Sequence, residues 1–444
     1  MSIQILNARS TACKRWLDNL LAQRRAGHDG VEGAVAAIVE AVRERGDQAL
    51  IELTQRYDNV DLRPTQLRIE PEESARALRG LAREERAALE LAANRIRTFH
   101  RHTVERSFSY RDRLGVRLGQ IVRPLARVGI YVPGGAAAYP STVLMNAIPA
   151  QVAGVKEIVM VSPLAPGEPA ARVVLAAAAL AGVSEVYRVG GAQAIAALAY
   201  GTQSIRPVNK IVGPGNAYVQ AAKRLVYGVT GIDMVAGPSE VLIIADDSAR
   251  PDWIAGDLIA QAEHGSGDES AILITTSQDL ALEVDQALER SLSDLPRAEA
   301  VRTALSRRGA AIVVEDIAQA CGLANRIAPE HLELEVRQSA RWVGHLDSAG
   351  AIFVGGASPA PFGDYLAGPN HVLPTAGWAR FASPLGAYDF IKRTSIIQAT
   401  PAAIEAIGPA VARLARLEGF EGHARAVEQR LRKRSKVNHG APKN

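Results

Sequence analysis

Four of the nine histidines in this 444-residue chain lie in short polar clusters that could bind a metal ion or move protons. The first cluster ends an expected helix that starts near Pro251 and contains Gln261, Glu263 and His264. Gln261 and His264 are three residues apart and share a helix face with Asp257, one turn earlier. Carboxylate, amide and imidazole groups on one face suit a hard or borderline metal ion. Spacing alone favours Glu263 and His264 as ligands, although Glu263 could equally be an ordinary surface residue.

The other three clusters each join a carboxylate to a histidine: Glu330 with His331, Asp364 with His371, and Glu418 with His423. Carboxylate and imidazole groups both accept protons near neutral pH. Glu330 and His331 follow a proline, which favours an irregular start rather than a regular helix. The Asp364–His371 cluster and the Glu418–His423 cluster lie among glycines, as functional loops often do. Each cluster alone is more often structural, but the four together favour a metal-assisted site.

Three glycine-rich segments could bring backbone amides close to a phosphate group. They follow expected strands, at residues 132–135, 189–193 and 212–216. None has the G-x-G-x-x-G pattern with its acidic ribose ligand. The segments therefore leave two interpretations open, a nucleotide site or a set of ordinary turns.

The expected secondary structure places these clusters in an α/β protein. Short β-branched runs bounded by Gly or Pro alternate with Ala-rich stretches, as in parallel α/β sheets. Strands are expected at residues 128–132, 158–161, 186–189, 241–244, 271–276 and 311–314. Helices are expected between them at residues 171–181, 192–199, 251–263 and 279–292. We therefore expect two α/β blocks, with mostly helical segments before about residue 110 and after about residue 385.

The composition indicates a globular protein of the cytoplasm. The formal net charge is only +4, and the basic run at residues 430–436 has no nucleic-acid-binding motif around it. The two cysteines, Cys13 and Cys321, cannot build a disulfide framework, which suits a reducing compartment. The longest apolar run, Val173 to Val183, is about half the length of a membrane span. We expect neither a signal peptide, nor a membrane association, nor a nucleic-acid partner.

The sequence resembles the histidinol dehydrogenase family over nearly its whole length. The most specific stretch covers residues 232–241, IDMVAGPSEV, and continues to QAEH at residues 261–264. Supporting segments lie at residues 128–135, 144–150, 190–195, 213–219 and 370–375. After His264 many family members have a proline two residues on, whereas this chain continues as GSGD.

The resemblance implies residue roles that spacing did not give. One zinc ion per subunit would be bound by Gln261, His264, Asp364 and, from a partner subunit, His423. This ligand set replaces the choice of Glu263. Glu330 and His331 would transfer protons, and NAD would contact Tyr131, Gln193 and Asn216. Substrate contacts would come from His331, the four zinc ligands, Ser239, His371 and Glu418.

The family implies the four-electron oxidation of L-histidinol through histidinal to L-histidine, with two NAD consumed, as the last step of histidine biosynthesis. Relatives that act on other small polar alcohols, including sulfonated diols, give an alternative. A non-catalytic nucleotide-binding or nucleic-acid-binding protein is a third hypothesis, based on the glycine segments and the basic tail.

The family also implies two incomplete Rossmann-like units, the second inserted in the first, with helical terminal pieces. We expect an N-terminal helical segment at residues 1–25 and a discontinuous first α/β domain at 26–130 and 238–384, with the metal and catalytic residues. A second α/β domain at 131–237 would bind NAD, and a helical segment at 385–444 would be exchanged in a homodimer with shared active sites.

Overall fold

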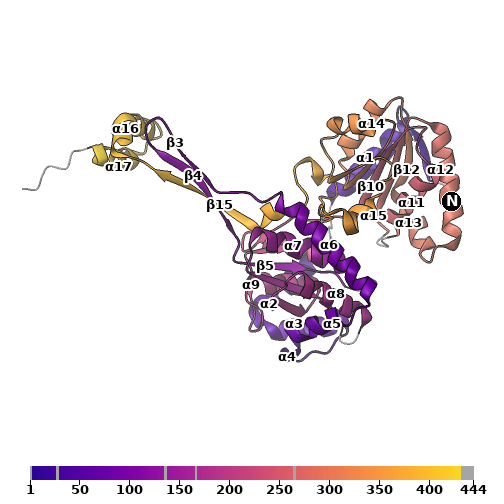
Figure 1. Ribbon diagram of the computed structural model, residues 1–444, viewed down its shortest axis with the longest axis horizontal. Helices are drawn as coiled ribbons and strands as arrows, with labels where there is room; N and C mark the ends of the chain where they lie inside the picture. The colour runs from indigo at the N-terminus through magenta and orange to yellow at the C-terminus, as the bar shows by residue number, and fades with distance from the viewer. Residues whose placement is uncertain (1–2, 27–29, 135–137, 166–167, 264–266, 432–444) are drawn as a thin grey trace, which may run out of the picture. The chain divides into compact units, whose positions relative to one another are not determined.

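The computed structural model describes residues 3–26, 30–134, 138–165, 168–263 and 267–431 (Figure 1). The described residues form two compact units. The first contains those within 1–104 and 125–390, and the second those within 105–124 and 391–444. Parallel sheets with helical layers make up the first unit, and the predicted α/β class is confirmed.

One sheet of the first unit has six parallel strands in the order β1-β12-β11-β10-β13-β14. They are β1 (Gln4–Asn7), β10 (Glu240–Ala245), β11 (Ser270–Thr275), β12 (Gly309–Val313), β13 (His331–Glu335) and β14 (Ala351–Val354). Successive residues of β10 face opposite sides, so Val241 and Ile243 enter one core and Leu242 and Ile244 the other. Both faces are covered, which explains why the strand is apolar throughout.

Helices pack on both faces of this sheet (Figure 1). One face carries α11 (Pro251–Ala262), α12 (Gln278–Ser291) and α13 (Ala298–Arg308). The other carries α1 (Thr11–Ala26) and α14 (Ile317–Ile327).

The other large sheet of the first unit has the order β2-β7-β6-β5-β8-β9. Its strands are β2 (Arg68–Ile69), which is antiparallel to its neighbour, β5 (Arg127–Tyr131), β6 (Glu157–Ser162), β7 (Glu185–Arg188), β8 (Lys210–Val212) and β9 (Gly231–Ile232). One core contains residues of α5 (Pro71–Arg79), α6 (Arg83–Arg101), α7 (Pro140–Ala153) and α8 (Pro169–Leu180). The other contains residues of α2 (Glu32–Arg45), α3 (Asp47–Asp58), α9 (Gly191–Tyr200) and α10 (Ala217–Val226), with α4 (Pro64–Leu67) beside it. The strand order reverses direction between β5 and β8, which makes a crevice at their carboxyl ends a favoured ligand site.

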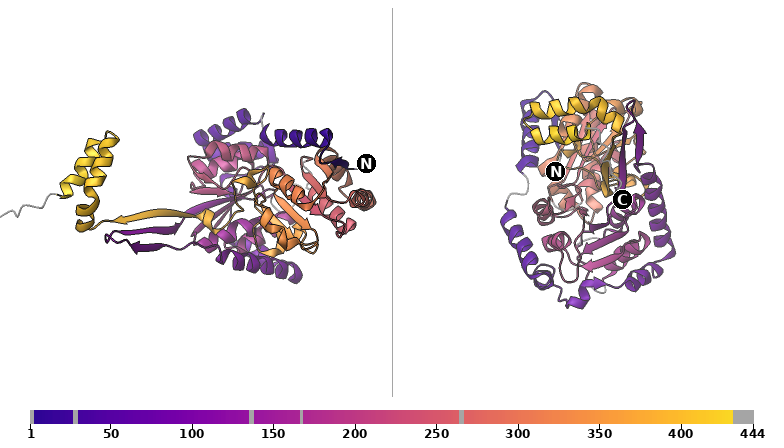
Figure 2. Two further views of the ribbon diagram at one scale, coloured as in Figure 1. Left: turned by 90° about the horizontal axis from the view of Figure 1, so that it is seen from above. Right: turned by 90° about the vertical axis from the view of Figure 1, so that its left-hand side faces the viewer.

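The second unit combines a three-stranded antiparallel sheet with a helical hairpin. The strands are β3 (Phe108–Arg111), β4 (Arg117–Pro124) and β15 (Ile391–Gln398), in the order β15-β4-β3. The helices α16 (Pro401–Leu417) and α17 (Glu421–Leu431) lie side by side (Figure 2).

The prediction of mostly helical ends was wrong in part. The strand β1 pairs along its whole length with β12, and β15 pairs over eight residues with β4. Neither strand alternates clearly between buried and exposed residues, so a period-2 pattern does not mark either of them. The domain boundaries stay a prediction, and the helices α2 to α6 pack against the sheet that contains β5. Among the described residues, none of the helices is both long and apolar enough to cross a membrane.

Candidate active site

The Glu330–His331 pair lies at the start of β13, directly after a sharp change of chain direction. The residue that follows the helix α14 is Ala328, whose φ of 51° is left-handed, and Pro329 then leads into the strand. The neighbouring strand β10 begins with Glu240, whose backbone N–H donates to Glu330 Oε2 at 2.9 Å. His331 Nδ1–H donates to the carbonyl of the same residue at 3.1 Å. The main chain of Glu240 therefore holds both side chains of the pair.

The Glu330–His331 pair is buried, and its environment raises the pKa of both groups above their ordinary values. Burial raises the pKa of Glu330 to about 7, against the opposing charge of His331 3.6 Å away. Burial lowers the pKa of His331, but Glu330 and Asp364 outweigh it and raise that pKa to about 9. His331 Nε2 lies 3.3 Å from Asp364 Oδ1. Because Nδ1 is held by a carbonyl, Nε2 is the atom that can exchange a proton with a ligand.

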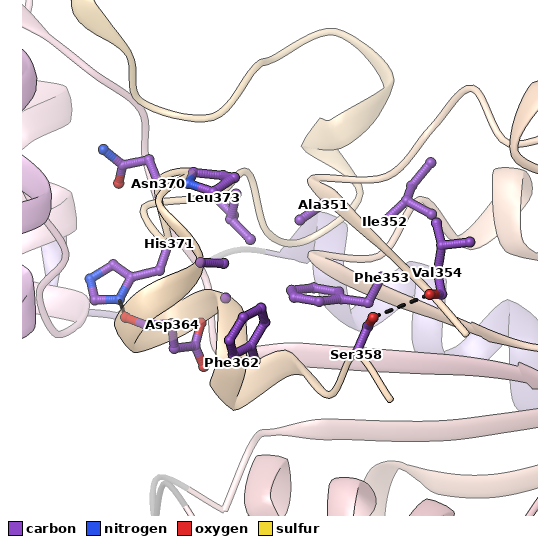
Figure 3. A pocket seen from close by; sticks show the side chains of 13 residues that line it. Ala351, Ile352, Phe353, Val354, Ser358, Phe362, Asp364, Asn370, His371 and Leu373 are labelled. Carbon is purple, nitrogen blue, oxygen red and sulfur yellow. Dashed lines mark hydrogen bonds between the residues drawn. The ribbon is translucent and has the colours of Figure 1, made fainter. Parts of the chain in front are cut away.

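Asp364 and His371 lie together beside this pair. Asp364 belongs to a π-helical turn, Gly363–Ala367, that follows α15 (Ala360–Phe362). His371 Nδ1–H donates to the backbone carbonyl of Asp364 at 2.9 Å, and Figure 3 shows both residues at the same cavity. This cavity has a volume of about 210 Å³, and its wall includes Phe353 and Phe362. It thus combines an acidic and an imidazole group with apolar walls.

Gln261 lies on the helix that packs beside β13. Carboxylate oxygens of Asp257, Glu333 and Glu335 lie within 4.8 Å of one another, which places α11 against the strand. Because α11 connects two parallel strands, it runs antiparallel to them. Gln261 follows Asp257 by one turn, about 6 Å. His331 precedes Glu333 by two strand residues, about 6.6 Å. The buried amide of Gln261 is therefore level with His331.

The acidic cluster of Asp257, Glu333 and Glu335 supports the turn that carries Asp364. Glu333 Oε1 accepts a hydrogen bond from Ala360 N–H at 2.6 Å, at the start of α15. Burial raises the pKa to about 6 for Asp257, about 8 for Glu333 and about 7 for Glu335. The alternating HLELE pattern of β13 put His331 and both glutamates on one face, and this was the available sequence signal.

Several described residues fit the predicted metal site. The buried amide of Gln261 and the carboxylate of Asp364 offer oxygen donors of the kind that zinc accepts. Burial raises the pKa of Tyr365, and the carboxylates of Asp364 and Glu263 raise it further. The end of α11 and the Asp364 turn thus lie within electrostatic range of each other. His264 lies outside the described residues.

A second and larger cavity lies at the carboxyl ends of β5 and β8. It has a volume of about 630 Å³, and Tyr131, Gln193 and Asn216 line it. Tyr131 Oη accepts from Gly191 N–H at 3.1 Å, and burial raises the pKa of this tyrosine to about 12. Asn216 Oδ1 caps α10 by accepting two backbone N–H groups, both at 3.1 Å. Gly213 has a φ of 116°, and a Cβ there would collide with the Tyr131 carbonyl.

This larger cavity is acidic. Asp58 and Glu168 line it, and none of its described lining residues is a lysine or an arginine. Burial raises the pKa of Asp58. Sequence reasoning missed Asp58 because it ends α3, about 70 residues before the nearest glycine segment.

A family model, curated relatives and a solved structure all resemble this chain over nearly its whole length. The family model described as histidinol dehydrogenase matches residues 21–431. The chain belongs to the histidinol dehydrogenase family. The histidinol dehydrogenase of Aromatoleum aromaticum is 52% identical over 434 residues, which are 98% of this chain and 99% of that protein. The histidinol dehydrogenase of Pseudomonas syringae pv. tomato is 51% identical over 431 residues, 97% of this chain and 96% of its own. A crystal structure of histidinol dehydrogenase from Elizabethkingia anophelis superposes with a TM-score of 0.89 at 35% identity, over 97% of this chain and 98% of that one.

Most of the residues predicted from the histidinol dehydrogenase family fall into two described groups in the first unit. Ser239 precedes Glu240 at the start of β10, next to the group formed by Glu330, His331, Asp364 and His371. Tyr131, Gln193 and Asn216 form the group at the larger cavity. Their individual roles stay predictions. The spacing-based candidate Glu263 caps the C-terminus of α11.

Glu418 and His423 belong to the second unit. Glu418 ends α16, and His423 lies in the first turns of α17 with its ring 5.0 Å from that of Phe420. Both side chains are exposed. Their place in an active site therefore stays a prediction.

Proposed function

We propose that this protein oxidises L-histidinol to L-histidine with two molecules of NAD. Membership of the histidinol dehydrogenase family supports the reaction. The observation that carries it is the buried Glu330–His331 pair, held by one backbone residue and facing Asp364. A carboxyl group whose pKa burial raises to about 7 and an imidazole whose Nε2 faces Asp364 suit successive proton transfers.

The two side chains divide the proton transfers between two steps. In the first, Nε2 of neutral His331, the form that predominates above its pKa of about 9, accepts the hydroxyl proton while the carbinol carbon gives a hydride to NAD, which leaves the aldehyde and NADH. In the second, Glu330 accepts a proton from water that adds to the aldehyde carbon. The hydrate anion formed in this way gives a hydride from its carbon to a second NAD and releases one further proton, which leaves the carboxylate and a second NADH. Burial of both side chains excludes bulk water from the aldehyde.

Gln261, His264, Asp364 and His423 of a second copy would hold one zinc ion. Zinc bound there supplies a positive charge that anchors amino and imidazole nitrogens of the substrate. Thiol chemistry is not needed, and burial raises the pKa of both Cys13 and Cys321.

The reaction is tested by the NADH yield. Purified protein supplied with zinc and NAD should form two NADH for each histidinol consumed. A yield of one would indicate a simple alcohol dehydrogenase, and no NADH would contradict the proposal. A dihydroxypropanesulfonate serves as the comparison substrate and should not be oxidised at a comparable rate.

A homodimer with shared sites follows from the ligand set. The exposure of Glu418 and His423 supports it, because an exposed carboxylate and imidazole are available to another chain. A His264→Ala variant and a His423→Ala variant should each be inactive. Mixing them under conditions of subunit exchange should restore up to about a quarter of the activity, by forming one intact site in mixed dimers. No recovery after verified exchange would contradict shared sites.

A further inference from the structure

The helix α1 contributes a buried arginine to the region behind the catalytic pair. Arg24 Nη2 lies 2.8 Å from Glu240 Oε1, and both side chains are only 5% exposed. Arg24 Nη1 also donates to the carbonyl of Ile327 at 2.7 Å. One guanidinium group thus joins two segments that are separated by more than 80 residues in the sequence.

Both segments lead directly to the catalytic pair. Glu240 is the residue whose N–H holds Glu330 and whose carbonyl holds His331. Ile327 ends α14, three residues before Glu330, where the chain turns sharply at Ala328. The Arg24 guanidinium therefore fixes the chain on both sides of the pair.

A contribution to stability does not by itself explain the buried ion pair of Arg24 and Glu240. Removing two charges from water costs several kcal/mol per ion, and a buried ion pair often contributes little net stability. Burial raises the pKa of Glu240, and the charge of Arg24 opposes that rise. An arginine stays charged in proteins and has a planar fork that can bind two acceptors at once, which a lysine cannot do in the same geometry.

An exposed ion pair links the same two helices and provides a comparison. Arg326 of α14 lies 3.0 Å from Asp18 of α1, and their side chains are 51% and 50% exposed. This pair contacts neither Glu240 nor the Glu330–His331 segment in any hydrogen bond of the described chain. It therefore tests whether any link between α1 and α14 has the same effect.

We propose that Arg24 is a positioning residue, which orients Glu330 and His331 by bridging the Glu240 carboxylate and the Ile327 carbonyl. The inference rests on the proposed function for the roles of Glu330 and His331. Arg24 touches no reacting atom, so its removal acts on the geometry of the pair and leaves the ligand cavities as they are.

Steady-state kinetics of the zinc-loaded protein tests this proposal. Arg24→Met should lower kcat about 10²-fold, since a displacement of about 1 Å has that effect, and leave KM for NAD within about twofold. Arg24→Lys should retain the charge but lose the second acceptor, with kcat about tenfold below wild type. The control variants Asp18→Asn and Arg326→Gln should keep kcat within about twofold.

The double variant Arg24→Met/Glu240→Gln separates positioning from stability. It removes the uncompensated carboxylate, so its thermal unfolding midpoint should recover towards wild type while kcat stays low. Recovery of both quantities would show a merely structural role and overturn the proposal. If Arg24→Met does not fold, Arg24→Lys and the double variant carry the test.

Amide hydrogen exchange distinguishes a failure of this inference from a failure of the proposed function. Peptides that cover residues 328–335 should exchange about tenfold faster in Arg24→Lys than in Asp18→Asn, whether or not histidinol is the substrate. Unchanged exchange there, or a kcat for Arg24→Met within about threefold of wild type, would overturn the positioning role. A wild-type protein that makes no NADH from histidinol would contradict the proposed function alone.

Discussion

The variant Lys223→Met is expected to destabilise the first unit and weaken NAD binding, because it leaves a buried carboxylate without its cation. Lys223 Nζ lies 2.5 Å from Asp233 Oδ1, with side-chain exposures of 0% and 1%. Nζ also donates to the carbonyl of Gly213 at 2.9 Å, and the N–H of Gly213 donates to Asp233 Oδ2 at 2.8 Å. Both members of the ion pair thus hold the backbone of Gly213, in the loop that leads to Asn216 in the larger cavity.

The magnitude follows from the burial of both groups. Removing one partner of a fully buried ion pair costs about 3–5 kcal/mol, since the remaining charge is uncompensated. Lys223→Met and Asp233→Asn should each cost this much. The double variant contains no unpaired charge, so its cost should be lower than that of either single variant and therefore at least about 3 kcal/mol below the sum of the single costs. A shifted Gly213 loop should also raise KM for NAD about tenfold, equivalent to about 1.4 kcal/mol.

Urea unfolding followed by circular dichroism measures the free energies, and initial rates give both KM values. KM for histidinol should change by less than about twofold, because the ion pair lies at the other cavity. The matched control is Arg224→Met on the same helix, whose ion pair with Glu32 is exposed, with side-chain exposures of 36% and 64%. It should change the free energy of unfolding by less than about 0.5 kcal/mol.

Two results would refute the reasoning about Lys223. One is a cost below about 1 kcal/mol for the single variant, which would mean that water reaches the Asp233 carboxylate. The other is strict additivity in the double-mutant cycle, which would show that the two charges do not interact.

Three further predictions concern individual carboxyl groups. Burial raises the pKa of Glu330 to about 7, and the carboxylates of Glu330 and Asp364 raise that of His331 to about 9; because both bases must be deprotonated, kcat should rise with pH through about 7 and again through about 9; a Glu330→Gln variant that keeps both the lower rise and full histidine formation would contradict the role. The folded-state pKa of Glu333 is raised from 4.5 to about 8, so the folded protein holds a proton that the unfolded chain releases above about pH 4.5. Glu333 should therefore contribute a fall in the free energy of unfolding of up to about 1.4 kcal/mol per unit as pH rises from about 5 to 8, and Glu333→Gln should reduce the slope by that contribution in urea titrations; equal slopes would refute it. Asp58→Asn should raise the ratio of kcat/KM for NADP to that for NAD about tenfold, since it removes a charge that repels the extra phosphate of NADP; an unchanged ratio would place that phosphate elsewhere.

Much of the α/β framework could be predicted from local patterns. The expected strand at residues 241–244 lies within β10, and the expected helix at 251–263 ends one residue beyond α11. Such elements are apolar over their whole length or are bounded by Gly and Pro residues. The pattern that predicts them therefore lies in the residues of the element and its immediate neighbours. The polar clusters and the glycine-rich segments also marked the parts of the chain around Glu330 and Tyr131, while the predicted roles of single residues came from the family resemblance.

Other features depend on partners that are distant in the sequence. Strands β1 and β15 have no period of their own and exist because β12 and β4 pair with them. Nothing local marks Arg24 or Glu240 as neighbours of the Glu330–His331 pair, since their contacts span 216 and 90 positions. The hydropathy and spacing of a segment indicate which of its own residues are buried. A hydrogen bond or ion pair between distant segments depends also on where the second segment lies in the folded chain. The residue types and the local elements were thus determined by the sequence alone, while the protonation of Glu330 and the orientation of His331 were decided only by tertiary packing.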